Sequence, residues 1–224
     1  LTAGEQVEAL TVEMVRLAHH ELSDPSAALR TALDSLKDFP ERLGLRTWIV
    51  DLAKETEGWD TVFTTVESVL DTHDDPSLVQ ALSLWLGSLY VDQGGHSQEA
   101  IKTFERVHTI DADNIPAMDA LEALYAATEE LTALRELLST RLKQAKDNER
   151  AEILQKLAEW TERAEGPVAA LAWWKELLWE RPEHGPARAA VGALLEVEET
   201  ADTAAGLLEP IFQREENWVG LIKV

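Results

Sequence analysis

The sequence predicts an all-α protein built as an array of antiparallel helix pairs. Apolar residues recur at helical spacing through most of the chain, and glycines, prolines and capping residues interrupt them at short intervals. In the clearest segment, 81–114, Leu82, Leu86 and Leu89 share one helical face before the turn at Gly94–Gly95, and a second apolar stripe follows. No segment alternates apolar and polar residues as a half-buried strand does, so we expect helices alone.

Recognisable signals begin and end the helices of the first half. Asp24–Pro25 and Asp75–Pro76 each place a capping carboxylate before a proline at the first helical position, where the missing N–H is not needed. Pro40 and Gly58 end helices. We expect helices at about Glu5–Leu22, Pro25–Pro40, Glu41–Glu55 and Trp59–Leu70, followed by the two helices of segment 81–114.

The second half continues the same pattern. We expect helices at about Ile115–Thr128, Leu131–Ala145, Asp147–Ala164, Pro167–Arg181, Ala187–Val197 and Ala201–Glu215. Pro210 lies inside the last of these, so we expect it to kink that helix or to shift its start. Asn217–Trp218 begins a further helix that Val224 truncates. Because the chain also begins at Leu1 and not at Met, we expect a fragment of a longer protein.

The second helix of each pair repeats one residue pattern at a nearly constant step. A mostly small residue recurs at steps of 34, 38, 34, 36 and 34 residues, and a larger residue follows it one turn later. The first lets the partner helix approach closely, and the second fills the adjacent space. The early positions are Ala28, Val62, Ala100, Leu134, Ala170 and Ala204, and the later ones are Ala32, Val66, Phe104, Leu138, Trp174 and Leu208.

This pattern resembles the tetratricopeptide repeat (TPR) family over roughly residues 10–216. The best match is Leu86, Gly87, Tyr90, Ala100, Phe104, Val107 and Asp111. Val62 and Leu134 depart from the small residue of the family, and Arg141 occupies an apolar position. The resemblance implies a right-handed superhelix of antiparallel helix pairs, a TPR-like α-solenoid. In this family the first helices line a concave groove that binds peptides or proteins.

We therefore predict a single repeat domain over residues 1–224. Since no pair buries its apolar stripe alone, neighbouring pairs must stack to complete the core. The predicted pairs are 1–40, 41–73, 74–112, 113–146, 147–183 and 184–216, with a truncated helix at 217–224.

Composition narrows the classes of partner. The 224 residues carry a net charge of −22, from 42 acidic and 20 basic side chains. This charge disfavours nucleic acid and anionic membrane surfaces, and it favours basic or apolar protein partners. An acidic surface that serves solubility alone is the alternative interpretation. The absence of cysteine excludes disulfides, thiolate catalysis and cysteine zinc sites. We find no signal peptide and no membrane-spanning run; cytoplasm is favoured, although the compartment stays open.

The TPR pattern places a small, partly apolar and acidic surface on the first helices. It lacks the Lys, Arg and Asn side chains with which some family members bind a C-terminal carboxylate. Such a surface fits a basic or amphipathic protein segment, whereas an ordinary solvated face is the alternative. The candidate partner-binding residues are Asp51, Leu84, Ser88, Val91, Asp119, Ala123, Glu159, Glu162, Ala193 and Glu196.

The tryptophans suggest a second interaction surface. Trp174 lies in the packing register of the repeat, and Trp173 points about 100° away from it on a helix. Trp173 and Trp179 either pack between repeats or form an exposed patch, and packing is the favoured interpretation.

No residue pattern predicts a metal, a cofactor or a catalytic centre. His19 and His20 are neighbours, so we expect them to point apart on a helix. His73 lies in a turn whose acidic residues are explained by capping. The stretch Asp111–Asn114 lacks the glycine and the distal glutamate of a calcium loop.

The sequence thus predicts a non-enzymatic protein-interaction scaffold within a larger protein or assembly. A regulatory or substrate-recruiting domain, attached to an enzyme outside this chain, is the alternative, and a catalytic domain in its own right is a third interpretation. The apolar end at Trp218–Val224 has no polar cap, so we also expect possible self-association there.

Overall fold

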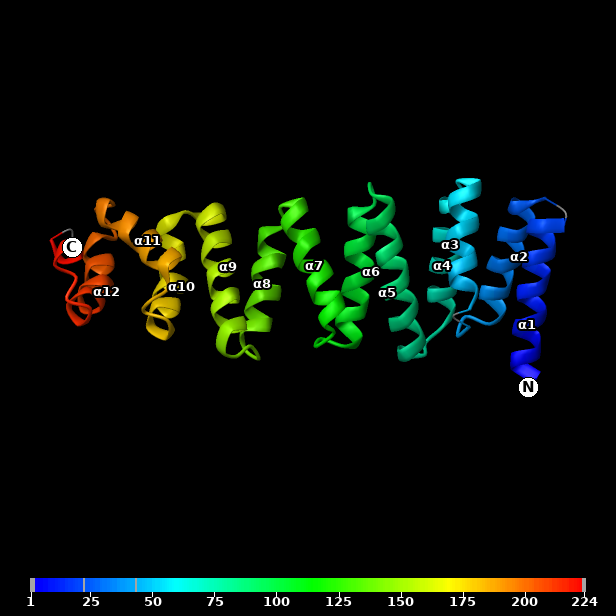
Figure 1. Ribbon diagram of the computed structural model, residues 1–224, viewed down its shortest axis with the longest axis horizontal. Helices are drawn as coiled ribbons and strands as arrows, with labels where there is room; N and C mark the ends of the chain where they lie inside the picture. The colour runs from blue at the N-terminus through cyan, green and yellow to red at the C-terminus, as the bar shows by residue number, and fades with distance from the viewer. Residues whose placement is uncertain (1–2, 22, 43, 223–224) are drawn as a thin grey trace. The chain divides into compact units, whose positions relative to one another are not determined.

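The computed structural model describes residues 3–21, 23–42 and 44–222, and every regular element in those ranges is a helix (Figure 1). The all-α prediction is therefore confirmed. The chain divides into two compact units, Leu1–Ala120 (unit 1) and Leu121–Val224 (unit 2), and their boundary falls inside α7 (Ile115–Thr128). The assignment of six pairs to one domain stays a prediction.

Unit 1 begins its helices where the capping signals predict. Its elements before α7 are α1 (Ala3–Arg16), a π-helical turn (Leu17–Glu21), α2 (Pro25–Asp38), α3 (Leu45–Thr56), α4 (Trp59–Thr72), α5 (Pro76–Gln93) and α6 (Ser97–Ile110). The carboxylate of Asp24 accepts the N–H of Ala27 at 2.8 Å. Asp75 likewise accepts the N–H groups of Ser77 and Leu78, at 2.8 and 3.0 Å. Both cap-plus-proline starts are thus confirmed.

One predicted helix boundary in unit 1 is wrong, whereas another helix changes its type. The first helix continues from Arg16 to Glu21 as a wider π-helical turn, Leu17–Glu21, and Leu22 lies outside the described residues. The third helix begins at Leu45 and not at Glu41. The N–H of Arg42 instead donates to the carbonyl of Phe39 at 3.2 Å, in a turn around Pro40.

Unit 2 follows the predicted order of helices, with small shifts at the helix ends. After α7 come α8 (Leu131–Leu142), α9 (Asp147–Glu165), α10 (Pro167–Glu180), α11 (Gly185–Ala193), a 3₁₀ turn (Leu194–Glu196), α12 (Ala201–Arg214) and α13 (Trp218–Leu221). The helix predicted to run to Val197 thus stops at Ala193 and tightens into the 3₁₀ turn. Pro210 does not shift the start of α12, which begins at Ala201 as the spacing predicts.

The repeat register predicted from the sequence is confirmed by burial. All six early positions of the second helices are 0% exposed, and the six later positions are at most 4% exposed. Arg141, at an apolar position of the register, is half-buried. Its guanidinium lies 3.1 Å from the carboxylate of Glu122 and 3.5 Å from that of Glu149. Ion pairing therefore makes an arginine tolerable at this position.

Within unit 2, ion pairs connect first helices at the repeat step. Lys156 on α9 pairs with Glu122 on α7, 34 residues earlier. Arg163 on α9 pairs with Glu129, just after α7, at 2.6 Å and again 34 residues away. Positions that are equivalent in sequence therefore lie side by side in space, as in a repeat array.

Candidate functional site

The ten predicted partner-binding residues all lie at the surface. Leu84 is half-exposed and the other nine are exposed. They come from the first helices of the predicted pairs, or from the turn that follows one of them. In unit 1 they are Asp51 on α3, Leu84, Ser88 and Val91 on α5, and Asp119 on α7; in unit 2 they are Ala123 on α7, Glu159 and Glu162 on α9, and Ala193 and Glu196 at the end of α11.

In unit 1, contacts of Arg46 show that α3 and α5 are neighbours. The Nη1 of Arg46 donates to the carbonyl of Ala81 at 3.4 Å, and the guanidinium lies 5.1 Å from the Trp85 ring. Burial lowers the pKa of Arg46. Val91 on α5 is 48% exposed, and the carboxylate of Asp51 on α3 is exposed as well. These two first helices therefore present an apolar side chain and an acidic side chain to solvent.

In unit 2, the two glutamates of α9 differ in their surroundings. The carboxylate of Glu159 accepts a hydrogen bond from Gln155, one turn earlier on α9, at 2.7 Å. That of Glu162 lies 3.4 Å from the indole N–H of Trp174, which is 3% exposed. Glu162 is therefore attached to the core of its own pair, whereas Glu159 bonds only to its own helix among the described contacts.

Glu196 lines a hollow near the end of unit 2. The hollow has a volume of about 730 Å³, and Gly192, Leu195, Phe212 and Val219 also line it. Arg188 at its edge binds Glu215 through Nη1 at 2.9 Å. This hydrogen bond holds the pKa of Glu215 below its ordinary value.

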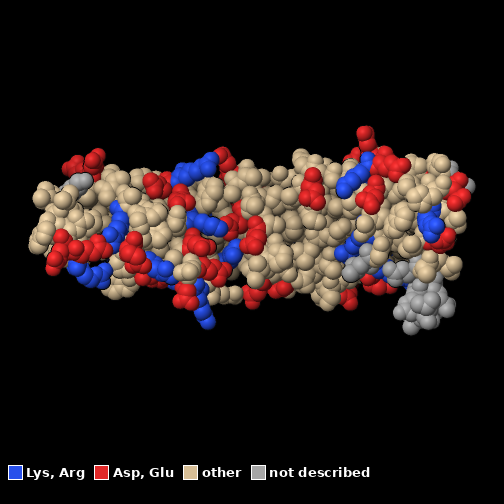
Figure 2. Space-filling view, in the orientation of Figure 1, with Lys and Arg blue, Asp and Glu red and all other residues tan. Residues whose placement is uncertain are grey.

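Several other carboxylates on the helices of unit 2, among them Glu122, Glu165 and Glu180, form ion pairs with neighbouring bases. Figure 2 shows basic and acidic side chains side by side over α8, α9 and α10. Arg150 contributes to this pattern as Arg141 does, because it pairs with two carboxylates, those of Glu176 and Glu180 of α10. The hydrogen bond to Glu180 raises the pKa of Arg150.

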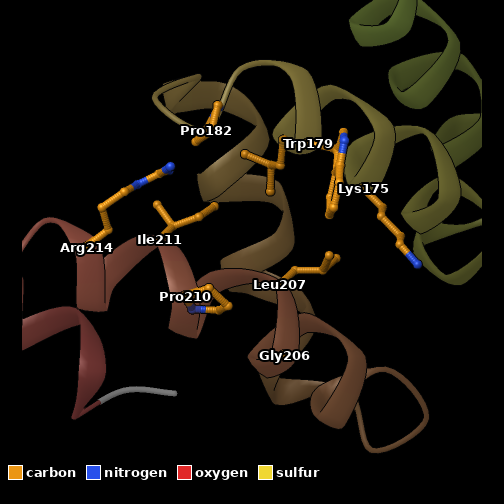
Figure 3. Close-up of a pocket in the computed structure, with 9 residues that line it drawn as sticks. Lys175, Trp179, Pro182, Gly206, Leu207, Pro210, Ile211 and Arg214 are labelled. Carbon is orange, nitrogen blue, oxygen red and sulfur yellow. The ribbon is translucent and has the colours of Figure 1, made fainter.

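The tryptophans divide between core and surface. Trp174 is buried, as its register predicts, and Trp173 is half-buried. Trp179 is 85% exposed, so the expectation that it packs between repeats is wrong. It lines a pocket of about 360 Å³ between α10 and α12, together with Leu207 and Ile211 (Figure 3). Sequence reasoning missed this pocket, although Pro182 and Pro210 in its wall mark the two segments that form it.

The two neighbouring histidines of unit 1 converge, contrary to the expectation that they point apart. The rings of His19 and His20 lie 4.5 Å apart, and both approach the ring of Trp48 edge-on, at 6.2 and 6.3 Å. The π-turn that contains them changes the angle between successive side chains. His19 also lies 2.7 Å from the carboxylate of Glu55.

Two other kinds of site have no support in residues 3–21, 23–42 and 44–222. That part of the chain contains no group of three or more His, Asp or Glu side chains placed to hold a metal ion. None of its helices combines the length and the apolar character needed to cross a membrane.

The apolar end of unit 2 is open to solvent. The side chains of Trp218, Val219 and Ile222 are all more than two-thirds exposed. Self-association through them stays a prediction.

Solved structures resemble this chain in fold. No protein-family model and no curated protein sequence matches it. The structure of Naa15/Naa10 bound to HypK-THB is 14% identical, with a TM-score of 0.51, and the match covers 96% of this chain and 38% of that one. A TPR protein from Parabacteroides merdae is 13% identical over 93% of this chain and 80% of its own, with a TM-score of 0.45. The TPR protein TTC0263 from Thermus thermophilus is 19% identical over 84% and 96%, with a TM-score of 0.36. At these identities the likeness concerns the fold alone.

Proposed function

We propose that this chain is a protein-interaction scaffold whose first-helix faces bind a basic or amphipathic protein segment. The observation that carries the proposal is a set of uncompensated carboxylates. Asp51, Glu159 and Glu196 are exposed, and none of them forms an ion pair with a described residue. In a chain of net charge −22, these groups give the first-helix faces a negative potential.

Each unit offers its own version of such a face. In unit 1, the exposed side chain of Val91 and the half-exposed Leu84 accompany Asp51, which suits an amphipathic segment. In unit 2, Glu159 and Glu196 accompany the small side chain of Ala193, so charge dominates recognition there. Long-range attraction between opposite charges mainly speeds association and selects the partner, and salt weakens it.

A charge-reversal experiment tests the proposal in unit 2. The probe is a fluorescein-labelled peptide in which Lys and Leu alternate at amphipathic helical spacing, and stopped-flow anisotropy measures its association rate at low and at physiological salt. We expect the double variant Glu159→Lys, Glu196→Lys to slow association about tenfold at low salt. We leave Glu162 unchanged, because its carboxylate contacts the indole of the buried Trp174.

The matched control is Glu136→Lys, which reverses an exposed carboxylate on the second helix α8. The control double variant combines Glu136→Lys with Asp202→Lys on α12, so that it changes the net charge as much as the test double variant does. If the control and test double variants slow association equally, the effect is one of net charge, and the first-helix faces are not the binding site.

A further inference from the structure

We propose that the pocket between α10 and α12 is a second docking surface, and that it takes an apolar protein segment carrying carboxylates. The pocket lies on the second helices of the last two predicted pairs, so it is separate from the first-helix faces discussed above. The pocket would prefer an acidic segment, whereas the first-helix faces would prefer a basic one. The inference goes beyond the proposed function and does not depend on it.

The walls of the pocket are apolar and partly exposed. Leu178 and Ile211 form the buried floor, at 3% and 6% exposure. Trp179 rises from α10 with 85% of its surface exposed, opposite Leu207 of α12 (Figure 3). A large, exposed aromatic ring beside a buried apolar floor is typical of the residues that dominate protein–protein binding energy.

The charged residues of this pocket are all basic. Lys175 and Arg214 lie on opposite sides of it, with Trp179 and Leu207 between them (Figure 3), and no acidic residue is among the described residues that line it. Among the described residues, neither cation has a hydrogen-bond or ion-pair partner. Two unpaired cations around an apolar pocket therefore stand out in a chain with 42 acidic side chains.

The acidic neighbours of these cations are occupied elsewhere. Glu176, next to Lys175, and Glu180, one turn beyond, both bind Arg150 on α9. Glu215, next to Arg214, binds Arg188 through both carboxylate oxygens. Arg214 attracts Glu215 electrostatically, but neither Arg214 nor Lys175 forms an ion pair with a described carboxylate. A carboxylate-bearing segment therefore complements the positive charge on the two sides of the pocket.

The backbone of α12 adds one polar feature to the apolar wall. Pro210 has no N–H, so the carbonyl of Gly206, four residues earlier, does not receive its usual helical hydrogen bond from position 210. Gly206 has no side chain, and the space where its Cβ atom would lie is open. A bound segment can therefore approach the backbone of α12 closely at this position.

A peptide selection tests which segments the pocket binds. The probe is a display library of random dodecapeptides, selected against the whole chain and then sorted by whether binding survives in Trp179→Ala. We expect peptides whose binding needs Trp179 to combine a large apolar side chain with a net negative charge. Their affinity should fall about tenfold or more in the double variant Lys175→Glu, Arg214→Glu.

Matched controls separate the pocket from general effects. Trp218→Ala removes another exposed tryptophan of unit 2, and Lys143→Glu reverses another exposed lysine. Neither should change binding of the selected peptides. Because Trp179 is 85% exposed, its truncation should leave the helical circular dichroism and the melting temperature unchanged, and this is measured first.

Three results would overturn the proposal. The first is a selection in which no peptide depends on Trp179. The second is a set of Trp179-dependent peptides that are neutral or basic. The third is a dimer of the chain, seen by sedimentation equilibrium and abolished by Trp179→Ala, because the occupant would then be a second copy. None of these results bears on the first-helix faces, whose test uses different variants.

Discussion

Gly87 on α5 and Phe104 on α6 fit together so closely that a side chain at position 87 has no room unless the Phe104 ring moves. A Cβ atom at Gly87 would lie 2.7 Å from Cζ of Phe104, and both residues are buried. We expect Gly87→Ala to lower the free energy of unfolding by about 1–3 kcal/mol, because the phenyl ring must move within a filled core. Urea denaturation followed by circular dichroism measures the change.

Gly206 on α12 should respond in the opposite direction to the same substitution. A Cβ there meets no atom within 4 Å, and the backbone is helical. Gly206→Ala should therefore raise the free energy of unfolding by about 0.5–1 kcal/mol, because alanine loses less backbone entropy in a helix. A decrease in both variants would mean that the two glycines are not distinguished by their surroundings.

Substitution of Ala170 tests the repeat register, because Ala170 is one of the six early, mostly small positions of the second helices. It is 0% exposed on α10, two residues before the exposed Ala172. We expect Ala170→Trp to cost about 1–3 kcal/mol or more by overpacking, whereas Ala172→Trp should stay within about 0.5 kcal/mol of the parent. Equal melting temperatures for the two variants would show that the register assigned to this pair is wrong.

The raised pKa of Tyr90 predicts that the free energy of unfolding decreases at alkaline pH. Burial of its ring, followed by the 2.6 Å hydrogen bond from its hydroxyl to Glu67, raises the pKa of Tyr90 above its ordinary value. The folded state then holds a proton that the unfolded state releases above about pH 10, so this contribution is present below that pH and decreases above it. Tyr90→Phe should cost about 1 kcal/mol near pH 8.

The pH dependence of the difference between parent and Tyr90→Phe provides the check. Other groups titrate in both proteins, so their contributions to the free energy of unfolding cancel in this difference. The stability difference should shrink as pH rises from about 8 to about 11, because only the parent loses the contribution of the protonated hydroxyl. A difference that stays constant over this range contradicts the shifted pKa.

Arg150 connects three helices of unit 2. It donates to the carbonyl of Leu142 at the end of α8 at 3.0 Å and to Glu180 of α10 at 2.6 Å, and it pairs with Glu176. We expect Arg150→Ala to cost about 1–2 kcal/mol, since its side chain is only 28% exposed. Arg163→Ala, whose ion pair with Glu129 involves a side chain 57% exposed, should cost less than about 1 kcal/mol by the same denaturation measurement.

The sequence predicts this fold well because its apolar residues recur at regular spacing, both within each helix and from one repeat to the next. Spacing decides which side of a helix is buried, so Ala170 and Trp174 are placed correctly from their positions in the repeat alone. Periodicity does not specify which side chain of the neighbouring helix lies opposite. The pairing of Arg141 with Glu122, and the contact of Glu162 with the Trp174 indole, therefore emerge only from the structure.

The surface is harder to predict for the same reason. Trp179 is apolar and lies on a helix, so pattern reasoning assigns it to packing, yet 85% of its surface stays open to solvent beside α12. The convergence of His19 and His20 depends on a π-turn, and no spacing rule announces one extra residue in a helical turn. What the sequence does identify are the ten surface residues of the first helices, and whether they bind a partner stays a prediction.

The ion pairs that join α7 to α9 make the repeats of unit 2 non-interchangeable. Glu122 and Glu129 on one repeat match Lys156 and Arg163 on the next. One further step of 34 residues leads to Ala190 and Val197, which carry no charge. A chain in which the α9–α10 repeat was deleted would therefore place two acids against two uncharged residues. A chain in which that repeat was duplicated would place bases against bases. Deleting or duplicating a whole repeat would therefore lose these two ion pairs, or bring like charges together, unless the facing residues were substituted as well.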